Sequence, residues 1–314
     1  MREQRVKPDS AAAATGELVW LLGQPHLADY LDFVRAKAVG GAAIAPRRLA
    51  DEWRAANDYY YELEQSQAGA ADGLDCRPLP PALRPLARRL RAHSWYREAF
   101  GTLPSRIMMV ELDRLIVSQT HIELPFADTL SAGLGRSPDH DALFRFCFPL
   151  DRPHPPVRVQ RLSSDRYLFA STSTDFRGHP LALMNEEQLA RLVSFGPVAA
   201  ALAVPVGFGC NFLSAVRSGG RAVLQNGYHR AYALRALGIS HAPCIVTDVT
   251  RKDELRVAAG EPVSEDPEFY FAAARPPMLR DYFDPKIRKV LPIVRMETVI
   301  EVEVKVRTSN AADC

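Results

Sequence analysis

The sequence predicts a mixed α+β protein, and three patterns support this class. Long amphipathic stretches occupy residues 17–100, and short apolar runs bounded by turn residues follow from Arg106 onward. Residues 185–249 are expected to alternate between helices and strands. Apolar residues at helical spacing predict amphipathic helices, whereas short apolar runs predict buried strands. Helices followed by a region that mixes strands and helices favour an α+β architecture.

Composition limits the function classes. The chain has 314 residues, 47% of them apolar, which suits two modest domains or one elaborated domain. Its 39 basic and 37 acidic residues leave a net charge of +2, so there is no general attraction to nucleic acid or membranes. Five cysteines without C-x-x-C spacing argue against a disulfide framework or a zinc ribbon. We therefore expect reduced thiols in a cytoplasmic protein.

Neither candidate membrane signal in the chain is convincing. Residues 1–16 are polar and then alanine-rich, lack the apolar region of a signal peptide, and are expected to form a disordered tail. Residues 192–216 contain no charged residue, but glycines and prolines interrupt them. We expect no membrane partner.

Residues 17–103 are expected to form a helical extension. An apolar stripe begins at Leu18 and continues past Pro25, a second helix is expected over 49–63, and a third over roughly 83–99. The third helix carries four arginines, Arg84, Arg88, Arg89 and Arg91. They suit either a solvated helix face or a contact with nucleic acid.

Residues 104–250 are expected to form the core, with an insertion at about 118–183. A strand is expected over 107–112, and further strands over 144–148, 157–160 and 167–170. Residues 251–314 are expected to form a C-terminal extension that ends in a strand. In that strand Val302, Val304 and Val306 alternate with charged residues, as on a strand with one wet face.

The second half of the core has clear local signals. Asn185 is a helix cap for residues up to 193, and residues 203–208 are strand-like. Residues 221–224 form a second apolar run. An Asn-Gly turn then leads into a helix over 231–237, which Gly238 closes, and a last strand is expected over 243–249.

The start of that helix suggests an anion site. Its first turn holds His229 and Arg230 and no acid. The amino end of a helix carries a partial positive charge, so two cationic side chains there repel each other unless an anion lies between them. Arg230 would bind phosphate oxygens in a bidentate manner, and His229 would donate a hydrogen bond or transfer a proton. Alternatively, Arg230 pairs with a buried carboxylate and His229 caps a core.

The sequence Gly227-Tyr228-His229-Arg230, followed by Leu237-Gly238, resembles the ParB/sulfiredoxin-like superfamily. Members carry a strand, a turn of the form Asp-Gly-x-His-Arg or Gly-Cys-His-Arg, a helix ending in Leu-Gly and a final strand. The likeness covers roughly 104–118 and 183–249 and implies a ParB/sulfiredoxin-like mixed sheet with helices. It includes neither the Gly-Glu-Arg-Arg sequence nor the downstream helix-turn-helix domain of chromosome-segregation ParB proteins.

The resemblance also narrows the chemistry. Tyr228 occupies the position of the sulfiredoxin cysteine, so reduction of sulfinic acids is not expected. The resemblance to free-amino-acid kinases implies that the His-Arg turn holds nucleotide phosphates and that a carboxylate activates a hydroxyl group. Glu123 is the candidate base, but the simpler interpretation, an ordinary polar loop residue, is favoured. Asn226 stands where aspartate is usual, which leaves a metal or base role of that position open.

A second polar stretch, residues 171–179, lies between two apolar segments. Asp175 is a candidate general base or metal ligand, and Thr174, Arg177 and His179 are candidate substrate contacts. The same residue types are ordinary turn and cap formers, so both interpretations stay open.

The sequence therefore predicts an enzyme that binds a nucleotide or another phosphorylated ligand. The reaction would be phosphoryl transfer or NTP hydrolysis on a small molecule, with Mg²⁺ offsetting the phosphate charge. The predicted phosphate-binding residues are Asn226, Gly227, Tyr228, His229 and Arg230. One alternative is a nucleic-acid-binding or nuclease module, with a local basic path through residues 84–91, Arg217, Arg221 and Arg235. The other is a non-catalytic interaction protein whose helical half docks a partner.

Overall fold

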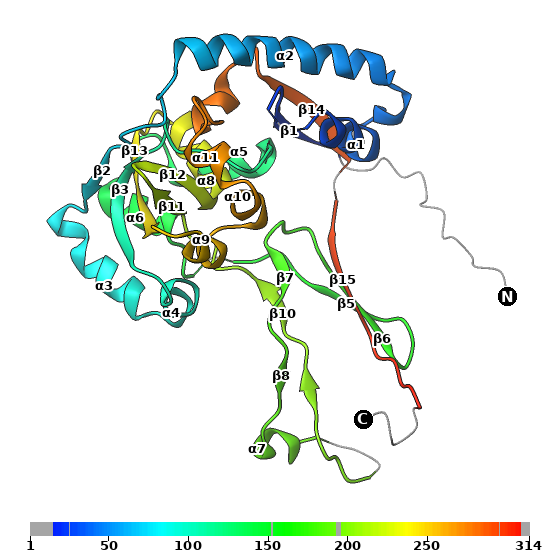
Figure 1. Cartoon of the computed structure of the whole chain (residues 1–314). Helices are drawn as coiled ribbons and strands as arrows, with labels where there is room; N and C mark the ends of the chain where they lie inside the picture. Colours follow the sequence, from blue (N-terminus) through cyan, green and yellow to red (C-terminus); the bar gives the residue numbers. More distant parts are fainter. Residues whose placement is uncertain (1–14, 25, 152, 193–195, 295, 309–314) are drawn as a thin grey trace. The chain divides into compact units, whose positions relative to one another are not determined.

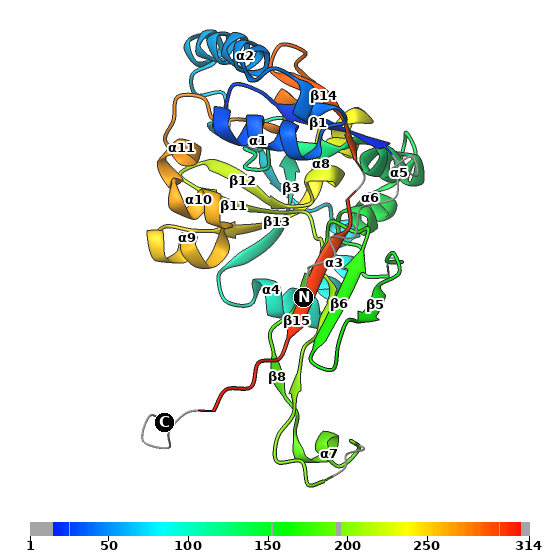
Figure 2. The ribbon, with the colours of Figure 1, turned by 90° about the vertical axis from the view of Figure 1, so that its right-hand side faces the viewer.

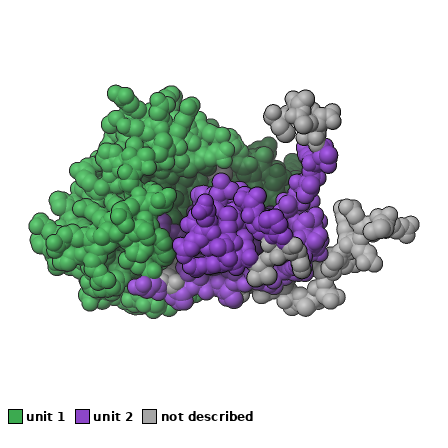
Figure 3. Space-filling model, turned by 90° about the horizontal axis from the view of Figure 1, so that it is seen from below, with its two compact units in different colours: residues 1–150, 211–295 green, residues 151–210, 296–314 purple. Residues whose placement is uncertain are grey.

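The computed structural model describes residues 15–308 except residues 25, 152, 193–195 and 295 (Figures 1 and 2). It is a mixed α+β protein with several sheets, which confirms the predicted class. The chain divides into two compact units (Figure 3): residues 1–150 with 211–295, and residues 151–210 with 296–314. Each unit combines segments that are distant in sequence.

The larger unit contains a five-stranded sheet in the order β12-β11-β13-β3-β2. These strands are β2 (Cys76–Pro78), β3 (Ser105–Glu111), β11 (Ser214–Ser218), β12 (Arg221–Asn226) and β13 (His241–Asp248). Only the β11–β13 pair is parallel among these strands. Residues 242–247 of β13 are all buried, as expected for a central strand covered on both faces.

Helix α8 (Tyr228–Ala236) connects β12 to β13 and packs against α5 (Leu124–Leu134), β4 (His121–Glu123) and η3 (Leu279–Phe283). The expected strands over 107–112, 221–224 and 243–249 and the expected helix over 231–237 are therefore confirmed, with small shifts at their ends. The expected strand over 203–208 is not part of this sheet. The strand that precedes β12 is β11 instead, which pairs with it through the Gly219–Gly220 turn.

A second, antiparallel sheet of the larger unit has the order β14-β1-β4. It consists of β1 (Thr15–Leu21), β4 (His121–Glu123) and β14 (Arg288–Val294). The expected helix beginning at Leu18 is wrong, because β1 is the central strand of this sheet. Residues 18–22 are all buried, and a continuous apolar run does not distinguish a buried strand from a buried helix. Residues 17–103 are therefore not purely helical.

Two helices cover this second sheet, as Figure 1 shows for the longer one: α1 (Leu27–Lys37) and α2 (Pro46–Ser66). Tyr30 and Val34 from α1, Ala56 and Tyr60 from α2, and Leu291 from β14 belong to one buried cluster. The helical spacing within each pair places both residues on the same face, so these two helices confirm the amphipathic pattern.

The expected third helix over 83–99 is divided into two. After the short turns η1 (Gly41–Ala43) and η2 (Pro81–Leu83), the chain forms α3 (Arg84–Ala92) and α4 (Ser94–Phe100). His93 separates them in an extended conformation, with φ −70° and ψ 140°. Its Nδ1 accepts a hydrogen bond from the Trp95 N–H at 3.2 Å, so a side-chain cap ends one helix and begins the next.

The strand expected over 144–148 is wrong, because residues there form a helix. After α5 (Leu124–Leu134), helix α6 spans His140–Cys147. Asp139 caps it, with its Oδ1 accepting from the Ala142 N–H at 2.7 Å. Leu143, Phe144 and Cys147 are buried on one face, a spacing that also fits a helix. The larger unit ends with α9 (Lys252–Ala258), α10 (Glu261–Glu265), α11 (Pro267–Phe271) and the turn η3 (Leu279–Phe283) before β14.

The smaller unit consists mainly of short strands. Its three-stranded sheet has the order β15-β6-β5, from β5 (Arg158–Arg161), β6 (Arg166–Ser171) and β15 (Thr298–Glu303). Two hairpin-like pairs follow: β7 (Phe176–Gly178) with β10 (Val206–Phe208), and β8 (Ala182–Leu183) with β9 (Leu202–Ala203). The expected final strand is present, but it ends at Glu303 and includes only the first of the three alternating valines.

Asn185 caps a helix as predicted. The Gln188 N–H donates to Asn185 Oδ1, and the Asn185 N–H donates to Gln188 Oε1, both at 2.9 Å. This reciprocal capping box begins the short helix α7 (Glu186–Leu189). The rest of the helix expected up to 193 is not formed by residues 190–192, and residue 193 lies outside the described part of the chain. Across the described residues, no helix combines the length and the apolar character that crossing a membrane requires.

Candidate functional site

The turn between β12 and α8 depends on glycine at position 227. Gly227 has φ +85° and ψ 25°, the left-handed conformation, and its N–H donates to Asn226 Oδ1 at 2.7 Å. A Cβ at this position would lie 2.9 Å from Leu213 Cδ1 and 3.0 Å from Leu213 Cα. The left-handed backbone conformation and the closeness of Leu213, the residue before β11, therefore both disfavour a side chain at position 227.

We expect Gly227→Ala to lower the free energy of unfolding by roughly 2 kcal/mol, from the left-handed conformation plus the displacement of Leu213. Gly238→Ala is the matched control, because Gly238 closes the same helix with φ +81° and a Cβ there would meet nothing within 4 Å. That variant should lose only about 1 kcal/mol. Urea denaturation of both variants tests this expectation, and equal losses would show that the Leu213 contact costs nothing.

The structure brings two predicted catalytic residues together. Glu123 ends β4, and its backbone N–H donates to His229 Nε2 at 3.1 Å. Phe126, in the first turn of α5, meets the His229 ring edge-on at 5.1 Å between ring centroids. Both Glu123 and His229 are half-buried. The carboxylate-bearing residue and the imidazole are thus neighbours although they are 106 positions apart in sequence.

This hydrogen bond assigns the tautomer of His229. A nitrogen that accepts from a backbone N–H carries no proton, so the imidazole is neutral and its proton lies on Nδ1. In this tautomer His229 carries no charge, so the repulsion between two cations that the sequence suggests in the first turn of α8 does not arise. What His229 contributes is an N–H donor at Nδ1 close to the amino end of a helix.

Arg230 does not extend into solvent. It is 2% exposed, and its Nη1 donates to the backbone carbonyl of Asn211 at 2.7 Å. Asn211 itself has a positive φ of 47°, so the guanidinium supports an unusual backbone conformation just before β11. In this arrangement Arg230 offers little surface to a ligand, and its expected bidentate phosphate contact stays a prediction.

Tyr228 is likewise directed into the protein. Its hydroxyl donates to the carbonyl of Leu224 and lies 2.8 Å from the hydroxyl of Ser118. Since the tyrosine proton goes to Leu224, Ser118 is the donor in the second bond. Burial raises the pKa of Tyr228 above its ordinary value. The side chain therefore ties residue 118 to the start of α8, and it is not a surface for phosphate.

The four predicted residues of the 171–179 stretch belong to the smaller unit, whereas residues 226–230 belong to the larger one. Thr174 and Asp175 lie in the turn before β7, where the Asp175 N–H donates to Ser173 Oγ at 3.2 Å. Arg177 Nε donates to the Asp175 carbonyl at 3.2 Å, and His179 is exposed. These local bonds are those of a polar turn. Catalytic or substrate-binding roles for these residues remain predictions.

The proposed basic path for nucleic acid is interrupted by the protein's own acids. Arg217 pairs with Asp248 at 2.6 Å, Arg235 pairs with Asp113 at 2.7 Å, and Arg221 pairs with Asp72. The arginines of α3, by contrast, are exposed. Because three of the guanidinium groups are neutralised locally, a continuous positive track is not formed by these residues.

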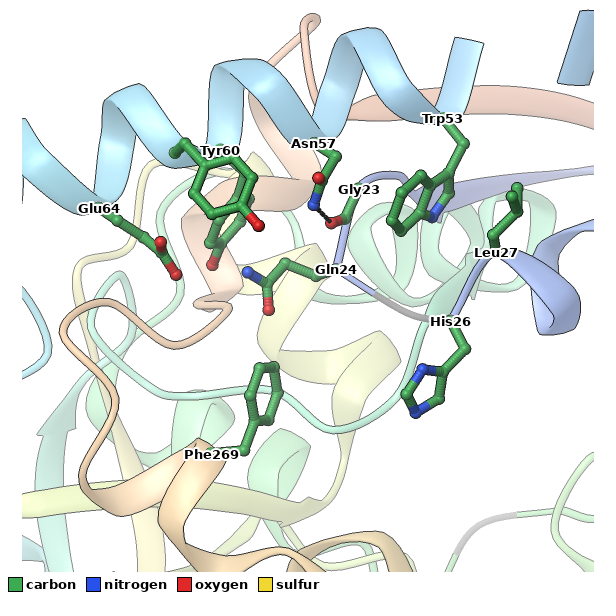
Figure 4. Close-up of a pocket in the computed structure, with 10 residues that line it drawn as sticks. Gly23, Gln24, His26, Leu27, Trp53, Asn57, Tyr60, Glu64 and Phe269 are labelled. Atoms are coloured by element: carbon green, nitrogen blue, oxygen red, sulfur yellow. Dashed lines mark hydrogen bonds between the residues drawn. The ribbon is translucent and has the colours of Figure 1, made fainter. Parts of the chain in front are cut away.

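Two cavities of the larger unit were not predicted from the sequence. One of about 470 Å³ is lined by Val117, Ser118 and Tyr270, among others. Its neighbour of about 210 Å³ lies beside α2 and is lined by Trp53 and Glu64 (Figure 4). The sequence feature that indicates the smaller cavity is Glu64. This carboxylate residue lies four positions after Tyr60 and beside the apolar face of the same helix.

Comparison of the chain with known protein families, with curated proteins and with solved structures finds no match. Within the described ranges, no group of three or more His, Cys, Asp or Glu side chains is arranged to hold a metal ion. Function is therefore inferred from the site itself.

Proposed function

We propose that the chain is a cytoplasmic enzyme that binds a nucleotide or another phosphorylated ligand at the start of α8. It would catalyse phosphoryl transfer or NTP hydrolysis on a small-molecule substrate. The observation that carries this proposal is the contact between Glu123 and His229 at the amino end of α8, with 3.1 Å between the Glu123 nitrogen and His229 Nε2. The β3, β11, β12, α8 and β13 elements would form a ParB/sulfiredoxin-like core around it.

Each residue has a role that its geometry permits. The Nδ1–H of neutral His229 would donate to a phosphate oxygen, and the dipole of α8 would favour the negative charge there. The Glu123 carboxylate would accept the proton of the attacking hydroxyl group or water. Arg230, whose guanidinium is buried beside Asn211, would hold the turn rather than the phosphate.

Mg²⁺ would accompany the nucleotide and offset phosphate charge. Such an ion is usually bound by phosphate oxygens, waters and one or two carboxylates rather than by a full set of protein ligands. Glu123, the predicted carboxylate residue of the larger unit, would supply one such ligand. A substrate-binding or catalytic role of Asp175, Thr174, Arg177 and His179, which belong to the smaller unit, stays a prediction from the sequence.

The test is a calorimetric titration of wild-type protein with ATP, GTP, CTP and inorganic phosphate, each with and without Mg²⁺. We expect His229→Ala to weaken binding by about tenfold or more, since a hydrogen bond to a charged group is lost. Glu123→Gln should retain binding and lower turnover by roughly a hundredfold or more. His140→Ala is the matched control, because His140 is an exposed histidine in the first turn of another helix, α6.

Two outcomes contradict the proposal. If His229→Ala binds nucleotide as tightly as wild type, the site is misplaced. If no nucleotide or phosphate binds wild-type protein, the result favours a non-catalytic interaction protein.

A further inference from the structure

The two cavities of the larger unit are neighbours. The cavity of about 210 Å³ and the cavity of about 470 Å³ share Gln24, His26 and Phe269 in their walls. The walls come from the end of β1 and the start of α1, from one side of α2, from residues 117–120, from α10 with α11, and from Pro277. We call the two cavities together the α2 cleft. Their combined size suits a small organic molecule.

The charged side chains that line the α2 cleft are predominantly acidic. Its walls carry the carboxylates of Asp29, Glu64, Glu261, Glu265 and Asp266. None of the described residues that line it is a lysine or an arginine, and His26 is the one titratable base among them. Glu64 is half-buried and the other four acidic residues are exposed, and together they make the cleft more favourable for a cation than for an anion.

Glu64 is the carboxylate best placed to act as a counter-ion. It lies on α2, is half-buried, and points toward the amide of Gln24 in Figure 4. Within the described part of the chain, it forms no hydrogen bond and no ion pair. A carboxylate that is partly removed from water without a partner is unfavourable, and a cationic ligand would remove that cost.

Gln24 supplies a second, independent observation. Its Oε1 atom is buried and has no hydrogen-bond partner among the described residues. A buried acceptor without a donor costs about 1–3 kcal/mol, so such atoms are rare and usually meet a ligand or water. Gln24 lines both cavities, and Figure 4 shows its amide in the middle of the smaller one. The missing partner is an N–H or O–H donor.

Aromatic rings complete the site. Trp53, Tyr60, Tyr61 and Phe269 all line the smaller cavity. Figure 4 shows Trp53, Tyr60 and Phe269 around the Gln24 amide. The faces of such rings attract ammonium groups, most strongly when water is excluded. A carboxylate, an acceptor oxygen and several rings around one small space are complementary to a positively charged nitrogen.

We propose that the α2 cleft binds a small organic ammonium ion. Its head group would lie between Glu64 and Gln24 oxygens and against Trp53 and Phe269, where it would donate to both oxygens. Its apolar body would occupy the larger cavity, whose walls include Leu21, Val117 and Pro277. This site does not involve the Glu123–His229 pair, and the inference is independent of the proposed phosphate chemistry.

The test is isothermal titration of the full chain with 2-phenylethylamine and with its neutral isostere 2-phenylethanol. We expect the amine to bind and the alcohol to bind at least about tenfold more weakly, because only the amine pairs with Glu64. Glu64→Gln should weaken amine binding by about tenfold or more and leave alcohol binding unchanged. Glu62→Gln is the matched control, since Glu62 lies on the same helix and is exposed.

A second variant protects the test against a folding defect. Gln24→Leu removes the acceptor while retaining most of the side-chain volume, and it should weaken the amine but not the alcohol. Unfolding temperatures of all variants are measured first. Equal affinity of amine and alcohol, no binding of the amine at millimolar concentration, or an unchanged affinity in Glu64→Gln would each overturn the proposal. Nucleotide binding, measured on the same samples, reports separately on the α8 site.

Discussion

Asp281→Ala is expected to lower the free energy of unfolding by about 3–5 kcal/mol, the largest effect of any single change considered. Asp281 and Arg275 are each 2% exposed. Arg275 donates to both carboxylate oxygens of Asp281, at 2.8 and 2.6 Å, and also to the hydroxyl of Tyr60 at 2.8 Å. The alanine variant would leave a guanidinium buried without its counter-charge, which is much more costly than the loss of the pair itself.

The Arg275–Asp281 pair also connects elements that are distant in sequence, which increases the expected loss of stability. Tyr60 lies on α2, and the Met278 N–H donates to Asp281 Oδ2 at 2.9 Å just before η3. Urea denaturation monitored by circular dichroism measures the loss. Asp51→Ala is the control, because Asp51 pairs with Arg54 at 3.3 Å on the exposed surface of α2. That change should cost less than about 1 kcal/mol. Similar losses in both variants would contradict the expectation.

The second large effect is a loss of stability in acid that depends on His121. This residue lies in β4, and its ring stacks on Trp20 with 5.7 Å between centroids and an angle of 2°. Burial, and next the charge of Lys37, lower the pKa of His121 from 6.5 to about 4. The folded state therefore binds this proton less readily than the unfolded chain does.

The sign of the effect follows from that difference. Above pH 6.5 the imidazole is neutral in both states and contributes nothing to the pH dependence. As the pH falls from 6.5 toward about 4, the unfolded chain gains the proton and the folded chain does not. Stability is lost through this window, by about 3 kcal/mol in total.

The comparison of wild type with His121→Phe isolates this contribution, since phenylalanine keeps a ring against Trp20 and does not titrate. Free energies of unfolding are measured at about pH 7.5 and about pH 4.5. The decrease in wild type should exceed that in the variant by about 2–3 kcal/mol, because carboxylates titrate equally in both. Equal decreases would mean that the His121 proton is not coupled to folding.

Several elements of the fold could be predicted from short stretches of sequence. The helices over 27–37 and 46–66 have one apolar face each, and the Asn185 capping box and the Gly227 turn have local signatures. These features depend on backbone preferences and hydrogen bonds within a few residues. The predictions that were wrong also have a physical reason. The run at Leu18 is apolar throughout, so periodicity could not show that it pairs with β14 and β4.

The residue types at the start of α8 are visible in the sequence, and Glu123 was a candidate base from the resemblance alone. The protonation and burial of those residues could not be inferred from the sequence. His229 is neutral because a backbone N–H from Glu123, 106 positions away, occupies its Nε2, and Arg230 is buried because the Asn211 carbonyl accepts from it. The excess of acidic side chains around the α2 cleft could not be predicted either, because they come from α1, α2, α10 and the residue before α11.

The amino acids alone were sufficient for the α+β class, for the helices α1, α2 and α8 and for the glycine at the β12–α8 turn. Only the folded chain shows which titratable groups carry charge, which are buried and which carboxylates share a cavity. The reason is that local structure depends on neighbours in sequence, whereas protonation, burial and ion pairing depend on neighbours in space.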